Sequence, residues 1–391
     1  MGETMNTDST DAEFPSSSDP AQARGVREVA EEQFALRQLI REYLIPVETN
    51  TIWYVLGGVL GLALILEILT GFLLTFVYTP DAGKAYQITK SLIASPGWHV
   101  ILGFHYFNSF LIFGLVMVHM MRVFISAAYR RGKQGLWLVG VVLAGLTFIL
   151  YITGEALHWD EVGFAVPWHV SEFFQAIGVA QAVNYTFEPL LSIPSATVKL
   201  TQIYAIHIAI ASLLLVLGIV LHYYLIRVKS ISLPFWHPAG GRTSPFSEHI
   251  RAWFIYGGII LGVILLLAIF IPRAPGTAPQ LLPSSPLYGS EEGPGALGAK
   301  PSFPISWTHG MNVFVAEHLG IEPDIWGSVA GMVLLLGALI LIPFLDRGDD
   351  EPLSWREAFD LRRRGWAFLA IAIFWIVMII GIIQNAVAGP G

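Results

Sequence analysis

The sequence predicts an all-α, polytopic membrane protein with seven transmembrane helices. Its 391 residues are 54% hydrophobic and only 13% charged, a composition far too apolar for an ordinary soluble protein. Seven apolar segments are each long enough to cross a bilayer as a helix. None of them alternates between polar and apolar residues as a membrane β-strand does, so we expect helices throughout.

The expected spans divide the chain into two parts that follow a polar arm. Residues 1–30 are rich in Ser, Asp and Glu and lack an apolar stretch, which predicts a disordered arm and not a signal peptide. Residues 31–235 contain the first four spans, which we expect to form a four-helix bundle, and residues 236–391 contain the last three. The spans cover residues 52–77, 100–125, 136–156, 202–226, 252–271, 326–345 and 366–383.

Lysine and arginine are distributed unevenly among the loops. The segment before the first span, the loops after the second, fourth and sixth spans, and Arg122 at the end of the second span account for 17 of the 22 basic residues. Because basic loops stay in the cytoplasm, we expect a multi-pass protein of the cell inner (plasma) membrane with its N-terminus cytoplasmic. The second and fourth spans then run in the same direction. The net charge of -7 argues against nucleic acid as a partner.

Four histidines lie inside these two parallel spans, His105 and His119 in the second and His207 and His222 in the fourth. In an α-helix a 14-residue step advances about 21 Å and returns to within about 40° of the same face, and a 15-residue step does nearly the same. His105 should therefore face His207, and His119 should face His222, so that each pair can bind one haem iron axially. A single buried histidine could equally be a hydrogen-bonded core residue, but two matched pairs predict a diheme four-helix bundle.

Glycines repeat at the same step in the first and third spans. Gly57 and Gly71 are 14 residues apart, as are Gly140 and Gly154. A glycine at each haem level lets a helix backbone approach the porphyrin, although small residues are also common where membrane helices pack. The chain has no cysteine, so the two b-type haems would be held non-covalently and any iron–sulfur cluster must belong to a partner.

Several motifs accompany the histidines and glycines. They are Gly57-Gly58 with Leu69-Thr70-Gly71, Gly97-Trp98 before His105, His119-Met-Met-Arg122, Thr153-Gly154 with Trp159-Asp160, the stretch from His222 to Pro234, and Pro343-Phe-Leu-Asp346-Arg347. Together these motifs resemble cytochrome b of the cytochrome bc-type (Rieske/cytochrome b) quinol-oxidising complexes. The 15-residue histidine step and a chain ending after seven helices are closest to the chloroplast-like and bacterial forms, with the cytochrome b and subunit IV parts fused.

The resemblance implies a function for the sites. His105 and His207 would bind a low-potential haem near the outer face, and His119 and His222 a high-potential haem near the inner face. The complex would oxidise quinol outside and pass electrons through the haems to an inner quinone, coupled to proton translocation. It would be a homodimer containing a Rieske iron–sulfur protein and cytochrome c or an equivalent carrier subunit.

Three basic residues lie near the expected inner haem and inner quinone. Arg122 lies where a guanidinium could neutralise haem propionates, while Arg227 and Lys229 fit an inner quinone pocket. All three could equally be no more than the positive charges that fix the topology.

The chain departs from the family pattern at the outer quinol site. The family's Pro-Glu-Trp-Tyr loop, after the fifth helix, aligns with Pro304-Ile-Ser-Trp307 or with the segment beginning at Pro301, and neither alignment contains the glutamate. In the third helix Glu155 replaces a tyrosine and His158 a proline, just before Trp159. We hypothesise that Glu155, with His158 beside it, performs the proton transfer. The alternative is a surface glutamate at a helix end.

Other departures also lie near the outer haem. Glu67 replaces the family's glutamine and is expected to be a protonated or paired carboxyl, and Leu102 and Gln202 stand where arginines usually bind propionates. Two rival functions therefore stay open. One is a diheme membrane anchor of another respiratory oxidoreductase without quinol bifurcation. The other is a transporter or channel without a redox role, which leaves the matched histidines unexplained.

Overall fold

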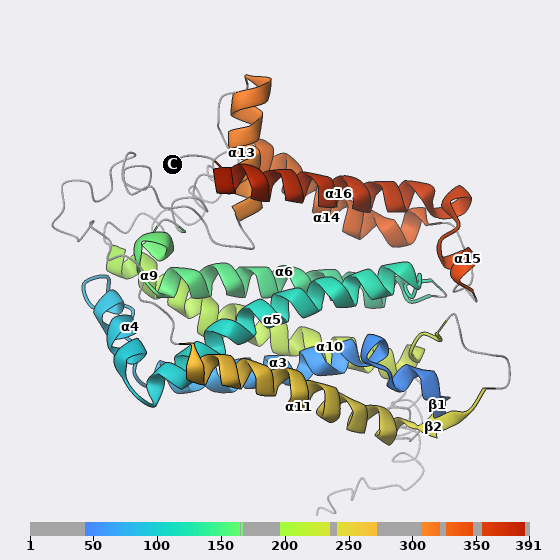
Figure 1. The fold of residues 1–391 in the computed structure, drawn as a ribbon, viewed down its shortest axis with the longest axis horizontal. Helices are drawn as coiled ribbons and strands as arrows, with labels where there is room; N and C mark the ends of the chain where they lie inside the picture. Colours follow the sequence, from blue (N-terminus) through green and yellow to red (C-terminus); the bar gives the residue numbers. More distant parts are fainter. Residues whose placement is uncertain are drawn as a thin grey trace, which may run out of the picture.

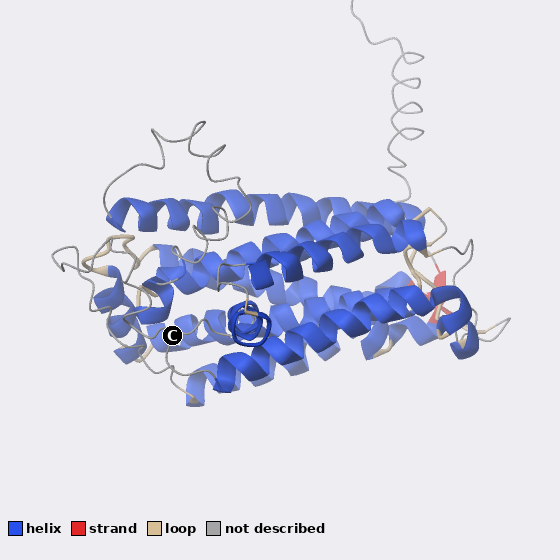
Figure 2. Cartoon of the chain, turned by 90° about the horizontal axis from the view of Figure 1, so that it is seen from above, coloured by secondary structure: helices blue, strands red, loops and turns tan. Residues whose placement is uncertain are grey.

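The computed structural model describes most of the chain from residue 44 onward. The described residues are 44–130, 132–164, 166, 196–234, 241–271, 306–320, 326–346 and 354–387. The arm 1–30 and Pro304 lie outside them. Within these ranges the chain is almost entirely helical, with one short strand pair at one end of the bundle (Figure 2).

Six helices are long and apolar enough to cross a membrane. They are α3 (Ile52–Thr75), α5 (Trp98–Ile125), α6 (Gln134–Leu157), the continuous helix formed by α9 (Ala196–Ala205), η2 (Ile206–Ala211) and α10 (Ser212–Lys229), α11 (Phe246–Phe270) and α16 (Leu361–Val387). All six coincide with predicted spans. The seventh predicted span coincides with α14 (Trp326–Leu345), but its side chains are described only from residue 335 onward, so a seventh crossing stays a prediction.

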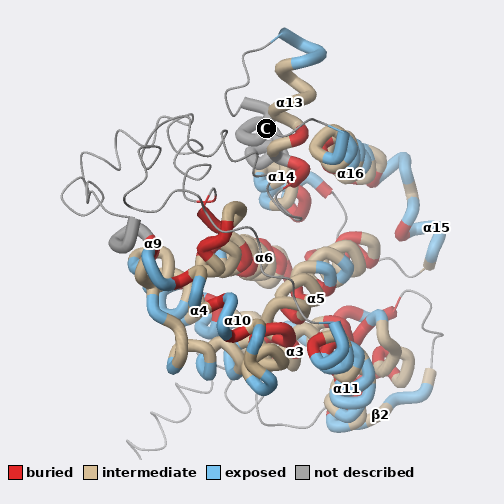
Figure 3. Tube along the Cα trace, turned by 60° about the vertical axis from the view of Figure 1, so that its left-hand side comes forward, coloured by how far each residue is buried: buried red, intermediate tan, exposed pale blue. Residues whose placement is uncertain are grey.

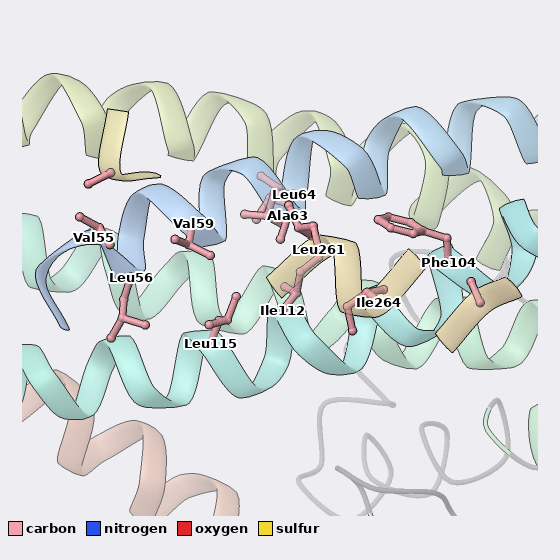
Figure 4. Close-up of a cluster of buried hydrophobic side chains, with 13 residues drawn as sticks. Val55, Leu56, Val59, Ala63, Leu64, Phe104, Ile112, Leu115, Leu261 and Ile264 are labelled. Carbon is pink, nitrogen blue, oxygen red and sulfur yellow. The ribbon is translucent and has the colours of Figure 1, made fainter. Parts of the chain in front are cut away.

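The first four spanning helices lie side by side, and the later helices pack on their outside (Figure 1). Helix α11 packs against α3 and α5, whereas α14 packs against α6 and α16. A buried apolar cluster joins α3, α5 and α11, with Val59, Ile112 and Leu261 among its members (Figure 4). Many large apolar side chains on the outer faces of α11 and α16 are exposed (Figure 3), as lipid-facing surfaces require.

Short elements close the two ends of the bundle. At one end β1 (Leu44–Pro46) pairs antiparallel with β2 (Thr243–Pro245), with Leu44 opposite Pro245, and η1 (Val47–Asn50) leads into α3. We call this the β end. At the other end α4 (Ala85–Ala94) packs against α5, and we call this the α4 end. Arg122, Arg227 and Lys229 all lie in the last turns of helices that finish at the β end.

A buried ionic network fastens the C-terminal helices to the bundle at the β end. The Asp346 carboxylate accepts hydrogen bonds from Arg364 Nε at 3.2 Å, Arg130 at 2.6 Å and the Tyr129 hydroxyl. The Arg364 guanidinium also donates to backbone carbonyls at the end of α5. Burial raises the pKa of the Tyr129 phenol, so Tyr129 remains a proton donor to the carboxylate.

The remaining helices are α13 (Ser306–Leu319) and the short α15 (Trp355–Ala358), which begins at the N-cap Ser354. Helix α13 crosses α16 closely because both carry glycine at the contact: a Cβ at Gly310 would meet the backbone of Gly381. The crossing helix α13 was not expected as a regular element, because the sequence analysis treated this region only as a loop.

Candidate metal centre

The structure brings the four predicted histidines together in the predicted pairs. The rings of His105, on α5, and His207, on η2, have centres 6.4 Å apart and planes inclined by 76°. Bonds from a metal to imidazole nitrogen are about 2.0 Å long, so this separation leaves room for a metal ion that both imidazoles would hold.

Threonine hydroxyls hold both of these rings. The Thr70 hydroxyl lies 3.1 Å from His105 Nδ1 and donates to the Leu66 carbonyl at 2.8 Å. The Thr153 hydroxyl lies 2.9 Å from His207 Nδ1 and donates to a carbonyl of its own helix at 2.8 Å. Because a hydroxyl has a single hydrogen, each threonine oxygen must accept from Nδ1–H. This fixes the tautomer that leaves the Nε2 lone pair available to a metal.

A glycine of the neighbouring helix lies against each of the four imidazoles. A Cβ at Gly71 would lie 3.1 Å from Cε1 of His105, and one at Gly154 would lie 3.0 Å from Cε1 of His207. At the other pair the corresponding distances are 3.2 Å from Gly57 to His119 and 3.7 Å from Gly140 to His222. The glycines therefore leave room for the edges of the imidazoles. The sequence pattern had instead predicted that they let a helix backbone approach the porphyrin.

The second pair, His119 and His222, differs from the first in its hydrogen bonding. The two side chains are close enough to interact electrostatically. Both Nδ1 atoms are buried and have no hydrogen-bond partner among the described residues. This pair therefore has no hydroxyl equivalent to those of Thr70 and Thr153.

A short π-helical segment explains the unequal histidine spacing. The 15-residue step from His207 to His222 would leave the two side chains about 60° apart on a regular α-helix, against about 40° in the opposite sense for 14 residues. Segment η2, Ile206–Ala211, absorbs the extra residue next to His207. The Ser212 hydroxyl donates to the His207 carbonyl at 2.5 Å.

These observations test whether the site fits a haem. The described residues contain no group of three or more His, Cys, Asp or Glu side chains that could form a metal cage. Each histidine pair supplies two imidazole nitrogens, and a haem would supply the remaining ligands of an iron held there. The donor set, the ring separation of His105 and His207 and the glycine spacing fit a haem that two histidines would hold.

Two of the three basic residues at the β end lie against aromatic rings. The Arg122 guanidinium lies 4.4 Å from the centre of the Tyr54 ring, and that of Arg227, which is buried, lies 4.8 Å from the centre of the Phe246 ring. Lys229 is exposed. Both arginines are therefore held by ring contacts beyond what a topology signal needs.

Sequence reasoning missed one polar group at this end. The His249 side chain is buried, and its Nδ1 lies 3.2 Å from Oδ1 of Asn50. Asn50 in turn donates to Ser244 at 3.0 Å. The contact joins segments about 200 residues apart, so no local spacing signalled it.

At the α4 end Glu155 and His158 lie together. Glu155 Oε2 is 4.0 Å from His158 Nδ1, and the two side chains are 10% and 14% exposed. The His158 ring lies 6.1 Å from that of Tyr106, on α5. Trp159, at a positive φ of 51°, is buried against Phe164. The Glu155 side chain is therefore largely enclosed by the described residues.

Trp307 is placed by different contacts. It lies at the start of α13, is buried, and its ring centre is 6.2 Å from that of Phe374 on α16. These contacts attach Trp307 to α16, while Glu155 and His158 lie at the end of α6. Pro304, its predicted companion, lies outside the described residues.

Two comparisons with known proteins agree with this arrangement. A family model described as cytochrome b/b6/petB matches residues 40–230, which contain all four histidines and their glycines. A chain of a solved structure titled "Hyperthermophilic respiratory Complex III" has a TM-score of 0.66 with this chain and covers 94% of both chains, at 19% sequence identity. At that identity the likeness establishes the fold, and it extends into the C-terminal helices.

Proposed function

We propose, from the match of residues 40–230 to a cytochrome b/b6/petB family model, that this chain is the diheme cytochrome b subunit of a quinol-oxidising bc-type complex. The observation that carries the proposal is the glycine–histidine approach found at all four histidines, at two levels between α3 and α5 and at two levels between α6 and the helix formed by η2 and α10. When bound, the two b haems supply reversible one-electron transfer across the membrane. We assign them to His105 with His207 and to His119 with His222.

The hydrogen bonds of the histidines support a difference in potential between the two haems. An acceptor at Nδ1 makes an imidazole a stronger donor to iron and favours the ferric state. Thr70 and Thr153 supply such acceptors to the first pair, whereas Nδ1 of His119 and of His222 has none among the described residues. We therefore assign the lower potential to the His105 pair.

The basic residues orient the protein in the membrane. The loops at the β end are rich in Lys and Arg, which supports a cytoplasmic β end in a plasma membrane. The His105 pair is then the outer pair and the His119 pair the inner pair. Arg122 and Arg227 lie at the inner end, where their guanidinium groups suit haem propionates and a quinone respectively.

At the outer end we propose that quinol transfers a proton to Glu155. Its carboxylate lies in largely enclosed surroundings with His158 at 4.0 Å, and a base needs that position next to its substrate and a route for the proton onward. Oxidation of quinol to quinone releases two protons and two electrons. One proton passes to Glu155 and the other to the outer aqueous phase, while one electron passes to a Rieske iron–sulfur partner and one through the histidine pairs to the inner quinone. Cytochrome c or an equivalent subunit carries the first electron onward, and the complex is a homodimer.

The experiment is a redox titration of the purified complex with quinol, with and without an oxidised Rieske or cytochrome c acceptor. We expect two b-type haem signals, and we expect quinol to reduce them faster when the acceptor is oxidised. Glu155→Gln should slow that reduction at least tenfold while both haem spectra stay unchanged. Unchanged turnover in this variant would remove Glu155 from the mechanism.

One observation favours a second candidate function. The glutamate of the outer loop motif is absent from the sequence, which suits a diheme anchor that passes both electrons of quinol along the same route. In that case the haems would still be reduced by quinol, but the oxidation state of the acceptor would have no influence on the rate.

A further inference from the structure

In the outer histidine pair, His105 has an acidic residue beside it, whereas the matching residue beside His207 is apolar. Glu67, on α3, places Oε1 3.3 Å from Nδ1 of His105. On the other half of the bundle Leu150 occupies the matching position, three residues before Thr153 as Glu67 is three before Thr70. The Thr153 and Thr70 hydroxyls lie 3.1 and 3.0 Å from the carbonyls of these two residues. The two helices are therefore equivalent here except for the carboxyl group.

The surroundings of Glu67 define how its two oxygens are used. Oε2 accepts a hydrogen bond of 2.8 Å from Nδ2 of Asn108, and the same amide donates to the Ala63 carbonyl at 2.9 Å. Asn108 is fully buried on α5, one turn from His105. Oε1 faces His105 Nδ1, which is a donor because the Thr70 hydrogen is already given to the Leu66 carbonyl. Both oxygens thus face donors, which is the pattern of a carboxylate.

We propose that Glu67 is a positioning and tuning residue that shares the Nδ1–H of His105 with Thr70 and lowers the reduction potential of the outer haem. A carboxylate hydrogen-bonded to a ligating histidine orients the ring and raises its basicity. Its negative charge also favours the oxidised haem, which carries one positive charge more than the reduced form. The inference rests on the proposed diheme function and adds a determinant that the resemblance does not imply, since it implies glutamine there.

The geometry also distinguishes this role from simple packing. A packing residue would need no fixed partner, yet Asn108 holds the carboxylate from the opposite helix while its own position is fixed by the Ala63 carbonyl. A buried charge without such partners would be strongly destabilising. The pairing therefore keeps a charge beside one axial ligand, where the influence on the iron is greatest.

The test is a spectroscopic redox titration of the purified complex carrying Glu67→Gln, which keeps the shape and removes the charge. We expect both haems to be present and the equilibrium constant for reduction of the outer haem to rise at least tenfold, equal to about 59 mV for one electron. The inner haem in the same sample serves as an internal control and should not move. Leu150→Gln, which adds an amide beside His207, should shift the outer haem much less.

The outcomes separate the two proposals. An unchanged outer potential in Glu67→Gln, or an equal shift of both haems, overturns the role of Glu67 while leaving the diheme function intact. A wild-type protein without two haem signals contradicts the diheme function itself. If Glu67→Gln does not assemble, Glu67→Leu replaces it with the same expectation, because leucine already occupies the matching site on α6.

Discussion

Adding one methyl group at Gly154 should disturb the outer haem, whereas the same change at Gly140 should not. The two glycines lie on the same helix, α6, and each faces a histidine of the neighbouring helix. A Cβ at Gly154 would lie 3.0 Å from Cε1 of His207, but a Cβ at Gly140 would lie 3.7 Å from Cε1 of His222. Carbon atoms in good contact are about 3.5 to 4.0 Å apart. Only the first substitution therefore forces the imidazole to move.

The expected magnitude follows from the cost of overpacking. Inserting a methyl group into a filled site costs about 1 to 3 kcal/mol, which corresponds to a loss of about 5- to 140-fold in haem affinity. The gain in helix propensity from Gly to Ala, about 1 kcal/mol, applies to both variants. The difference between Gly154→Ala and Gly140→Ala thus isolates the contact with the imidazole.

The assay measures how much of each b haem the purified variants retain and the affinity of each site on haem titration. Gly154→Ala should lose the low-potential signal selectively, while Gly140→Ala should keep both signals. Equal losses in the two variants, or full retention in Gly154→Ala, would refute the inference that the glycines make room for the histidines.

Two further predictions concern buried polar contacts. Thr153→Val removes the hydrogen-bond acceptor of His207 and should weaken haem binding about 10- to 100-fold, measured by haem titration. Thr147→Val should show no such loss, because the Thr147 hydroxyl donates to a carbonyl of its own helix. Arg364→Leu leaves the Asp346 carboxylate without its most buried partner and should lower the free energy of unfolding in detergent by about 3 to 5 kcal/mol. Arg363→Leu, an exposed neighbour, should change it by less than about 0.5 kcal/mol. Similar losses from both arginines would contradict the importance of burial.

Much of the fold could be predicted because membrane helices are specified by local composition. Helix α14 begins and ends at the residues expected, and α5 begins at Trp98, two residues before the predicted start. The pairing of His105 with His207 followed from the direction of the helices, which the basic loops indicate. Helix bounds and helix directions depend on the hydropathy and charge of many residues together, so one atypical residue does not change the prediction.

Other features depend on single long-range contacts and could not be read from periodicity. The π-helical turn next to His207 was hidden because a 15-residue step also fits a regular helix loosely. The bond between Asn108 and Glu67 joins two helices through one amide. The same holds for the contact of Trp307 with Phe374, which joins α13 to α16. A hydropathy pattern predicts which residues are buried or lie in the membrane, but it does not predict which side chains contact one another.

The placement of one histidine of each pair on either half of the bundle has a consequence for how the protein is made. Helices α3 and α5 form a unit with His105 and His119, and η2 with α10 supplies the other two ligands, so neither unit alone can complete the coordination of an iron. Under the proposed assignment of the haems, their capture would wait until the chain has been synthesised through α10. Because metal binding is coupled to the ordering of its ligands, each bound cofactor would hold the two units together. A cell short of haem should then accumulate a full-length chain whose two units are only loosely associated.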